Sequence, residues 1–160
     1  MRKLGWSGLM AIALMAWASF AMASEWSRYG NARFQYGIDI PPGFPSVAES
    51  DNGDGGVSAT PDGRAKLMVW GSFLVDRSFA AEMQWRIGQA RAAGWDITYQ
   101  KHQAKWAAWS GVKGNRIVYQ RGIAACRGAA AYFRLEYDKD QAKVFDPIVA
   151  RLSKSLRGEC

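Results

Sequence analysis

Apolar and polar residues alternate along several stretches of the chain, with the two-residue period that is typical of half-buried β-strands. The stretch 33–40 carries an apolar residue at every second position and ends at two prolines, which cannot donate to a strand ladder. The stretch 65–74 is almost continuously apolar, as expected for a central strand. The same pattern predicts five further strands, at 57–60, 96–103, 105–110, 116–121 and 129–137.

A helical period replaces this alternation after residue 76. Apolar side chains then recur every three or four positions, at Phe79, Met83, Ile87 and Ala90. Asp76 or Ser78 can cap the start of this helix, and Gly94 is a typical stop signal. We expect the charged side chains of the helix to lie on its solvent-exposed side: Glu82, Arg86 and Arg91.

The last stretch, 141–156, also has a helical period, with apolar residues at Val144, Ile148, Leu152 and Leu156. Pro147 either begins the regular part of this helix, with Asp146 as its cap, or kinks a longer helix. The complete order is three strands, one helix, four strands and a terminal helix. This order predicts the α+β class, with an antiparallel sheet of about six to seven strands and two packed helices.

Residues 1–23 have the three-part layout of a secretory signal peptide. Two basic residues are followed by the uncharged stretch 4–20, and small residues precede Ser24. We therefore expect cleavage after Ala23, export to the periplasm or beyond, and a single mature domain at 24–160. The alternative is an uncleaved membrane anchor, because about 20 apolar residues can span a bilayer. No later stretch is long and apolar enough to do so, so the mature protein is expected to be soluble.

The chain has two cysteines, Cys126 and Cys160, and one histidine, His102. In an oxidising compartment the simplest expectation is a disulfide between the two cysteines. The alternative is one buried and one terminal free thiol. A metal centre needs more ligands than two thiols and one imidazole provide, so no metal site is predicted.

The formal net charge of +7 comes from basic residues that are scattered along the chain. Nucleic-acid binding is not expected, because no run of like charge forms a basic arm. The loop 50–55 resembles the opening of a calcium loop, but Pro61 stands where the bidentate glutamate should fall. A tight turn that uses glycines explains the same residues.

A catalytic site is not predicted, and neither is a cofactor. His102 lies among polar residues, where a solvated strand position explains it. The spacing brings no two carboxylates into an obvious acid–base pair, among Asp39, Glu82, Glu136, Asp138 and Asp140.

Tryptophan offers a better indication of function, because tryptophan and arginine dominate the energetics of binding surfaces. Six of the eight tryptophans fall in the predicted mature domain. Trp106 and Trp109 are three positions apart, so on a regular strand one should face the core and the other should be exposed or covered by a helix. The candidate binding surface is Trp106, Trp109, Arg116 and Tyr119. The alternative is that all these aromatic residues only pack.

Several turn and core residues form a recognisable set: Tyr29, Asn31, Arg33, Phe34, Asp39, Pro41, 52–55, Asp62, Gly63 and 145–149. In these residues the sequence resembles small exported proteins of proteobacteria that are mostly uncharacterised. More distantly, the order of strands and helices resembles the Mog1/PsbP-like α/β/α sandwich. The resemblance implies a binding, assembly or chaperone-type role without a shared active site.

These observations favour an exported, non-enzymatic binding or accessory protein that acts on a protein or a small ligand in the cell envelope. The alternative is an inhibitor or immunity-type protein directed against an envelope-targeting enzyme. An immunity protein has one particular enzyme as its partner, whereas an accessory protein need not.

Overall fold

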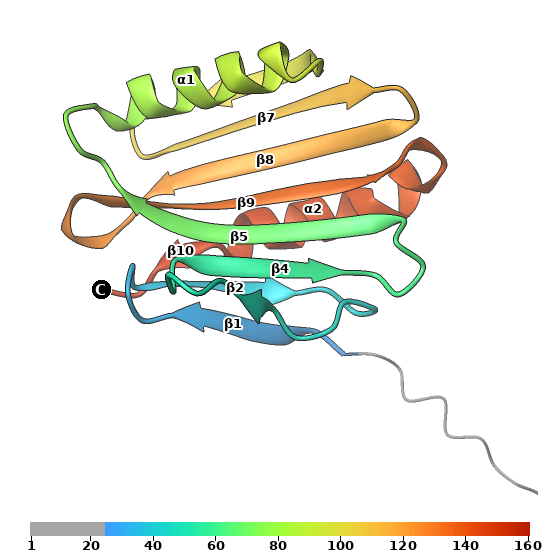
Figure 1. Cartoon of the computed structure of the whole chain (residues 1–160), viewed down its shortest axis with the longest axis horizontal. Coiled ribbons are helices and arrows are strands. Elements are labelled where there is room, and N and C mark those ends of the chain that lie inside the picture. The colour runs from blue at the N-terminus through green and yellow to red at the C-terminus, as the bar shows by residue number, and fades with distance from the viewer. Residues whose placement is uncertain (1–24) are drawn as a thin grey trace, which may run out of the picture.

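The structure is a computed structural model that describes residues 25–160 (Figure 1). The predicted leader, 1–23, and its cleavage site lie outside the described residues. Seven strands form a large antiparallel sheet in the order β3-β4-β5-β9-β8-β7-β6, and three form a small antiparallel sheet in the order β1-β2-β10. The large sheet consists of β3 (Ala48–Glu49), β4 (Gly55–Ala59), β5 (Ala65–Phe73), β6 (Asp96–His102), β7 (Trp106–Lys113), β8 (Arg116–Ala124) and β9 (Ala129–Asp138). The small sheet consists of β1 (Ser27–Asn31), β2 (Tyr36–Ile40) and β10 (Arg157–Gly158).

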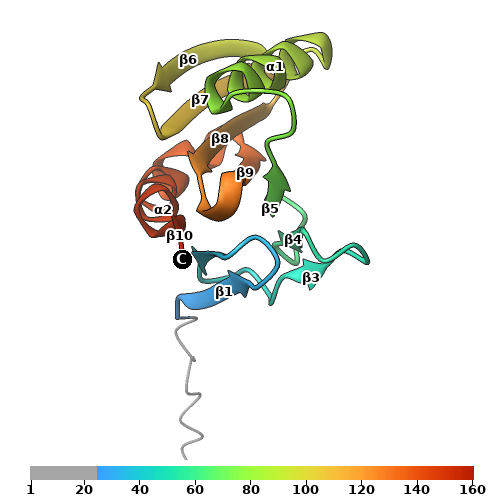
Figure 2. The same cartoon turned by 90° about the vertical axis from the view of Figure 1, so that its left-hand side faces the viewer.

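Two helices cover opposite faces of the large sheet: α1 (Phe79–Ala92) and α2 (Ala142–Ser155). α1 packs on β6 and β7, whereas α2 lies on the other face, between β8, β9 and the small sheet (Figure 2). Short 3-10 turns precede β9 and α2: η1 (Cys126–Gly128) and η2 (Lys139–Gln141). The predicted α+β class, the large antiparallel sheet and the two packed helices are confirmed. Within 25–160, neither helix has the length and apolar character needed to cross a membrane.

The alternation pattern predicts strands but does not show that some of them form a separate, small sheet. The first predicted strand, 33–40, lies in this sheet as β2 and pairs with β1 and β10 instead of with the large sheet. Its side chains still point into the core, because Tyr36 and Ile38 are fully buried between the two sheets and α2. Alternation therefore identified the buried residues of this strand correctly.

The α1 helix begins after Ser78, whose Oγ accepts a hydrogen bond from the Ala81 backbone N–H (3.2 Å). Arg91 is exposed, as expected. The expected exposure of Glu82 and Arg86 is wrong: Glu82 is 9% exposed, and the Arg86 guanidinium pairs with it at 2.8 Å. The helix turns this side towards the sheet, where Arg86 lies over the ring of Tyr132.

Pro147 lies inside α2, five residues after its first residue, so Asp146 is not the cap of this helix. Val144 was expected in the core but is 61% exposed, and Phe145 is buried instead, stacked on Tyr137. A spacing of four residues drifts by about 40° per step around a helix of 3.6 residues per turn. Over three such steps from Leu156, Val144 has therefore turned away from the sheet.

The predicted disulfide between Cys126 and Cys160 is confirmed, with a Cα–Cα distance of 5.6 Å. It joins η1 to the last residue of the chain. The adjoining backbone is held on the small sheet, because Glu159 donates its N–H to the Gln35 carbonyl (2.7 Å). The bond and the strand pairing of β10 thus fix the C-terminal segment against β2.

The large sheet has two unequal edges. One edge is β3, which has only two residues, and the other is β6, which is exposed along almost its whole length. The β6–β7 ladder changes register between Ile97 and Tyr99, which is a β-bulge.

Candidate functional site

The four residues predicted as a binding surface do not share one surface. Trp106 and Tyr119 pack on the α2 side of the large sheet, whereas Trp109 packs on the α1 side. The expectation that the two tryptophans face opposite sides of their strand is therefore confirmed. Trp109 is 0% exposed and cannot touch a partner, so its assignment to a binding surface is wrong.

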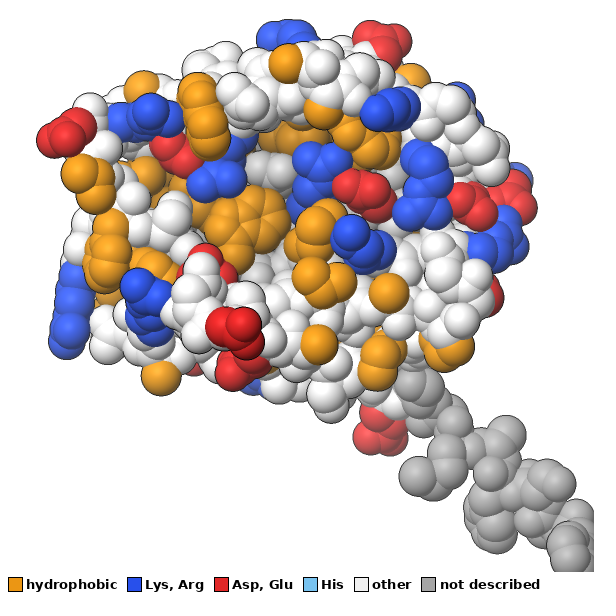
Figure 3. All heavy atoms as spheres, viewed as in Figure 1, with side chains coloured by type: hydrophobic (Ala, Val, Ile, Leu, Met, Phe, Trp, Pro, Cys, Tyr) orange, Lys and Arg blue, Asp and Glu red, His pale blue; other side chains and the backbone are white. Residues whose placement is uncertain are grey.

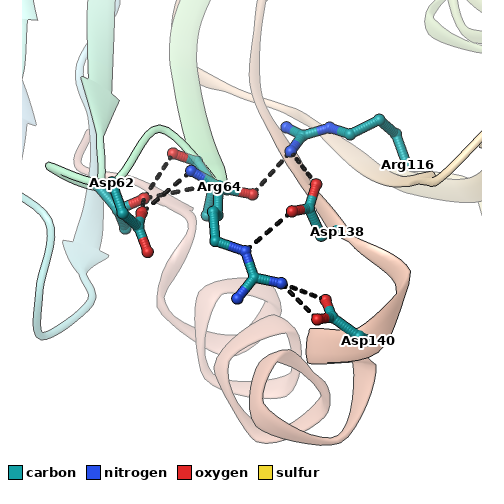
Figure 4. Close-up of polar contacts among 7 residues, drawn as sticks. Asp62, Arg64, Arg116, Asp138 and Asp140 are labelled. Carbon is teal, nitrogen blue, oxygen red and sulfur yellow. Dashed lines mark hydrogen bonds and ion pairs between the residues drawn. The ribbon is translucent and has the colours of Figure 1, made fainter.

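Arg116, the fourth residue, belongs to an ionic cluster at one end of the sheet (Figure 4). Its guanidinium donates to Asp138 and to the Arg64 carbonyl, each at 2.7 Å. Arg64 in turn donates from Nε to Asp138 (3.0 Å) and binds Asp140. Hydrogen bonds from Arg116 and Arg64 lower the pKa of the Asp138 carboxyl group. The cluster joins the ends of β5, β8 and β9, and it is explained by fold stability.

Every carboxylate considered for acid–base chemistry is paired with arginine. The pairs are Asp39 with Arg28 and Arg151, Glu82 with Arg77 and Arg86, Glu136 with Arg134, Asp138 with Arg64 and Arg116, and Asp140 with Arg64. These ion pairs explain the five carboxylates as structural residues.

Metal chemistry is not supported by the described part of the chain either. Within residues 25–160, no three histidine, cysteine, aspartate or glutamate side chains gather as a metal site. In the loop 50–55, the Asp54 carboxylate accepts hydrogen bonds from Ser50 Oγ (2.9 Å) and Asn52 Nδ2 (2.8 Å). Gly53 has a φ of +66°. The loop is a turn whose oxygens bond to one another.

A concave surface lined by both aromatic and basic side chains lies between α1 and the large sheet. It is a hollow of about 420 Å³. Its lining comes from β5, α1, β8 and β9: Trp70, Trp85, Arg86, Gln89, Ala90, Ala93, Gln120 and Arg134. Figure 3 shows this side of the molecule, where basic side chains flank apolar ones below α1. We call this hollow the α1 cleft.

The strand register explains why these side chains meet. Residues directly opposite each other in neighbouring strands point to the same face of a sheet. One such row crosses four strands: Met68, Arg134, Gln120 and Trp109. The next row contains Trp70, Tyr132, Gly122 and Ala107.

Gly122 makes this arrangement possible. A Cβ at this position would lie 2.7 Å from Met83 Sδ on α1 and 2.8 Å from the Tyr132 ring. The missing side chain lets α1 approach β8 and lets the Tyr132 ring lie across the strand. The α1 cleft is the part of this face that the helix leaves uncovered.

Aromatic rings form the sides of the cleft, and guanidinium groups lie on them. Trp70 and Tyr132 stack with their centroids 5.2 Å apart. The Arg86 guanidinium lies 4.1 Å from the Tyr132 centroid, and that of Arg77 lies 5.1 Å from the Trp85 centroid. Trp85 is 47% exposed at the rim. Burial raises the pKa of the Tyr132 hydroxyl, which therefore remains neutral.

Gln120 is the unusual polar residue of this region. Four polar side chains are buried in the described part of the chain: Asn31, Ser58, Glu82 and Gln120. The first three make hydrogen bonds or ion pairs. Gln120 is 3% exposed, and its Nε2 has no hydrogen-bond partner among the described residues. The same holds for Arg86 Nε and for the indole nitrogen of Trp109, which is opposite Gln120 in the ladder.

Sequence reasoning did not find this site, although one indication was present. Gln120 and Arg134 are polar residues in the middle of strands that otherwise alternate towards a core. Their direct pairing across β8 and β9 depends on the register, which the sequence alone does not give.

Comparison with known proteins places the fold. No protein-family model and no curated protein matches the sequence. Among solved structures, PsbP (CyanoP) from the cyanobacterium Synechocystis is similar at a TM-score of 0.64 and 14% identity, covering 91% of this chain and 98% of that one. The Ran-binding protein Mog1p of Saccharomyces cerevisiae is similar at a TM-score of 0.59 and 9% identity, covering 83% and 95%. A mutant form of Mog1 gives 0.60 and 10%, covering 84% and 96%.

The fold is thus the Mog1/PsbP-like sandwich, as the order of elements predicted. At these identities the likeness concerns the fold alone, because one fold carries many functions.

Proposed function

We propose that this protein is an exported, non-enzymatic binding protein of the cell envelope and that the α1 cleft is its ligand site. The observation that carries the proposal is the buried, unpartnered amide of Gln120 at the floor of an open aromatic hollow. An unpaired buried donor costs about 1–3 kcal/mol, so its retention needs a reason beyond folding. A ligand that accepts a hydrogen bond provides one.

Two further observations support binding over catalysis. Each carboxylate considered for acid–base chemistry is held in an ion pair with arginine. Yeast Mog1p, which shares the fold, is named as a Ran-binding protein, so this architecture can serve binding. Concave sites with aromatic walls and a few polar groups are also typical ligand sites.

The proposal can be tested with the indole N–H signals of the tryptophans in an NMR spectrum. The exported protein, purified from the envelope fraction and labelled with 15N, is titrated with fractions of envelope extract. We expect the signals of Trp70 and Trp85 to shift, because both line the cleft. The variants Trp70→Phe and Trp85→Phe assign the two signals.

Trp26 serves as the internal control, because it lies beside α2, far from the cleft face. If every extract fraction leaves Trp70 and Trp85 unmoved, or shifts only Trp26, the α1 cleft is not the ligand site. Mass spectrometry of the same preparation tests the leader: a chain that begins at Ser24 is expected, and one that begins at Met1 contradicts export with cleavage.

A further inference from the structure

We infer that the ligand of the α1 cleft is an aromatic monocarboxylate: a planar ring that bears one negatively charged carboxyl group. This inference rests on the proposed function and adds the chemical class of the ligand. The geometry that supports it is a donor-rich floor beside an aromatic wall, within one hollow of about 420 Å³.

The first argument is the excess of donors. Among the unpartnered buried atoms on this side of the sheet, Gln120 Nε2, Arg86 Nε and Trp109 Nε1 are N–H groups, and Tyr132 Oη is a hydroxyl. Two of them belong to residues that line the hollow. Rotation of the terminal amide of Gln120, a broad two-fold torsion, turns its N–H groups into the cleft. A carboxylate has only acceptors, so it complements such a floor.

The second argument is charge. The two lining guanidiniums each have a carboxylate partner already, Glu82 for Arg86 (2.8 Å) and Glu136 for Arg134 (2.7 Å). Arg77 also binds Glu82 (3.1 Å), and Lys113 donates to the Ala93 carbonyl at the end of α1 (2.6 Å). These four cations face two carboxylates, so the net excess is two positive charges. This balance suits one negative charge better than the several charges of a di- or triphosphate.

The third argument is the wall. Trp85 is half exposed at the rim of the hollow, and Trp70 lies on the opposite element, β5. The Arg86 guanidinium lies over both rings, 5.4 Å from the Trp70 centroid and 5.7 Å from the Trp85 centroid. A ligand ring therefore packs beside Arg86, against the exposed part of Trp85, where it buries apolar area and gains from aromatic contact. A volume of about 420 Å³ lies in the lower part of the range for small-molecule sites, so a ligand with one or two rings fits.

The inference is tested by calorimetric titration of the exported protein with indole-3-acetate as the probe. Three comparison ligands separate the contributions of charge, ring and type of anion to the binding free energy. Indole-3-acetamide removes the charge, acetate removes the ring, and phenyl phosphate changes the anion. We expect indole-3-acetate to bind at least about tenfold more tightly than the amide and acetate, the scale of one charged hydrogen bond.

Two outcomes overturn the inference. If the neutral amide binds as tightly as the carboxylate, the donors at the floor do not select an anion. If phenyl phosphate binds more tightly than indole-3-acetate, the ligand is a phosphoryl compound. In either case the proposed function stands provided that envelope fractions still shift Trp70 and Trp85. If neither the fractions nor the carboxylate shift them, both proposals fail.

Variants locate the binding and separate it from folding. Gln120→Leu removes the amide and keeps its bulk, so we expect at least tenfold weaker binding with an unfolding midpoint that is unchanged or higher. Arg134→Gln should weaken binding similarly. The matched control is Arg151→Gln, which removes an arginine that stacks on Trp26 beside α2. Full affinity in Gln120→Leu, or equal loss in the control, contradicts the assignment.

Discussion

The two faces of the large sheet are built from alternate residues of the same strands, yet they are covered differently. On the α2 side, α2 and the small sheet close over an apolar core that includes Leu67, Phe133 and Leu152. On the α1 side, one helix covers β6 and β7 and leaves the α1 cleft over its neighbours. Phe133 and Arg134 are adjacent in β9 and point to opposite faces. A single strand thus contributes to the core on one side and to the site on the other.

The largest expected effect tests the closed face. Leu152→Ala removes a fully buried side chain of α2 and leaves a cavity, so the free energy of unfolding should fall by about 2–5 kcal/mol. Urea unfolding measures it. Val144→Ala on the same helix is the control and should change stability by less than about 0.5 kcal/mol, because Val144 is exposed. Equal effects of the two changes would show that α2 does not close this face as described.

The second prediction concerns the covalent closure of the same face. Reducing the Cys126–Cys160 bond releases the loop of 34 residues that it closes, which should cost about 4 kcal/mol. Unfolding curves with and without reductant measure the loss, and the double variant Cys126→Ser/Cys160→Ser should not respond to reductant. Hydrogen exchange should increase in β10 and β2 while α1 keeps its protection. Uniform loss of protection across both faces would contradict this localisation.

The third prediction disturbs the floor of the cleft face. Gly122→Ala places a methyl group against Met83 and Tyr132, so it should destabilise the protein by about 1–3 kcal/mol. Gly88→Ala in α1 is the matched change, because nothing lies within 4 Å of its new Cβ. It should stabilise the protein by about 0.5–1 kcal/mol through helix propensity. A neutral Gly122→Ala would mean that α1 does not need this close approach.

The smallest expected effect concerns Asp138, which lies in the ionic cluster at the end of the large sheet and belongs to neither face. The pKa of Asp138 is lowered in the folded protein, so its contribution to stability is present above its unfolded pKa and is lost as the pH falls through the folded value. Asp138→Asn should therefore lower the urea midpoint near neutral pH, and its difference from the original protein should shrink below about pH 4. A difference that is constant from pH 7 to pH 3 would show that the ionised carboxylate is not what Arg116 and Arg64 stabilise.

The sequence predicted the closed face better than the cleft face, and the reason is physical. A core face needs only apolar residues at the right period, and the predicted apolar strands 65–74 and 129–137 contain the buried Leu67, Phe133 and Leu135. The strand β10 was missed, because it has two residues and forms only by pairing with β2 and by the nearby disulfide. Short strands that depend on a partner leave no periodic signal.

The cleft depends on distances between elements, which a one-dimensional pattern does not contain. Glu82 and Arg86 are typical of a solvated helix side, but α1 lies so that this side meets the sheet. The strand pattern allows Trp109 to be either buried or exposed. The position of α1, which buries it completely, is not contained in that pattern. Gln120 is identified as a candidate ligand-binding residue only because its buried amide lacks a hydrogen-bond partner. Whether a partner is present depends on the three-dimensional surroundings, which the sequence does not give.

The bulge at Ile97 and Tyr99 bears on how separate molecules behave at high concentration. An uncovered outermost strand is a template on which a second molecule can add its own strand, and repeated addition leads to aggregates. The change of register in β6 breaks the even row of N–H and C=O groups that such addition requires. Charged side chains along this strand, among them Asp96 and Lys101, oppose it further. The longer exposed edge strand of the large sheet is therefore poorly suited to pairing with a second copy of the protein.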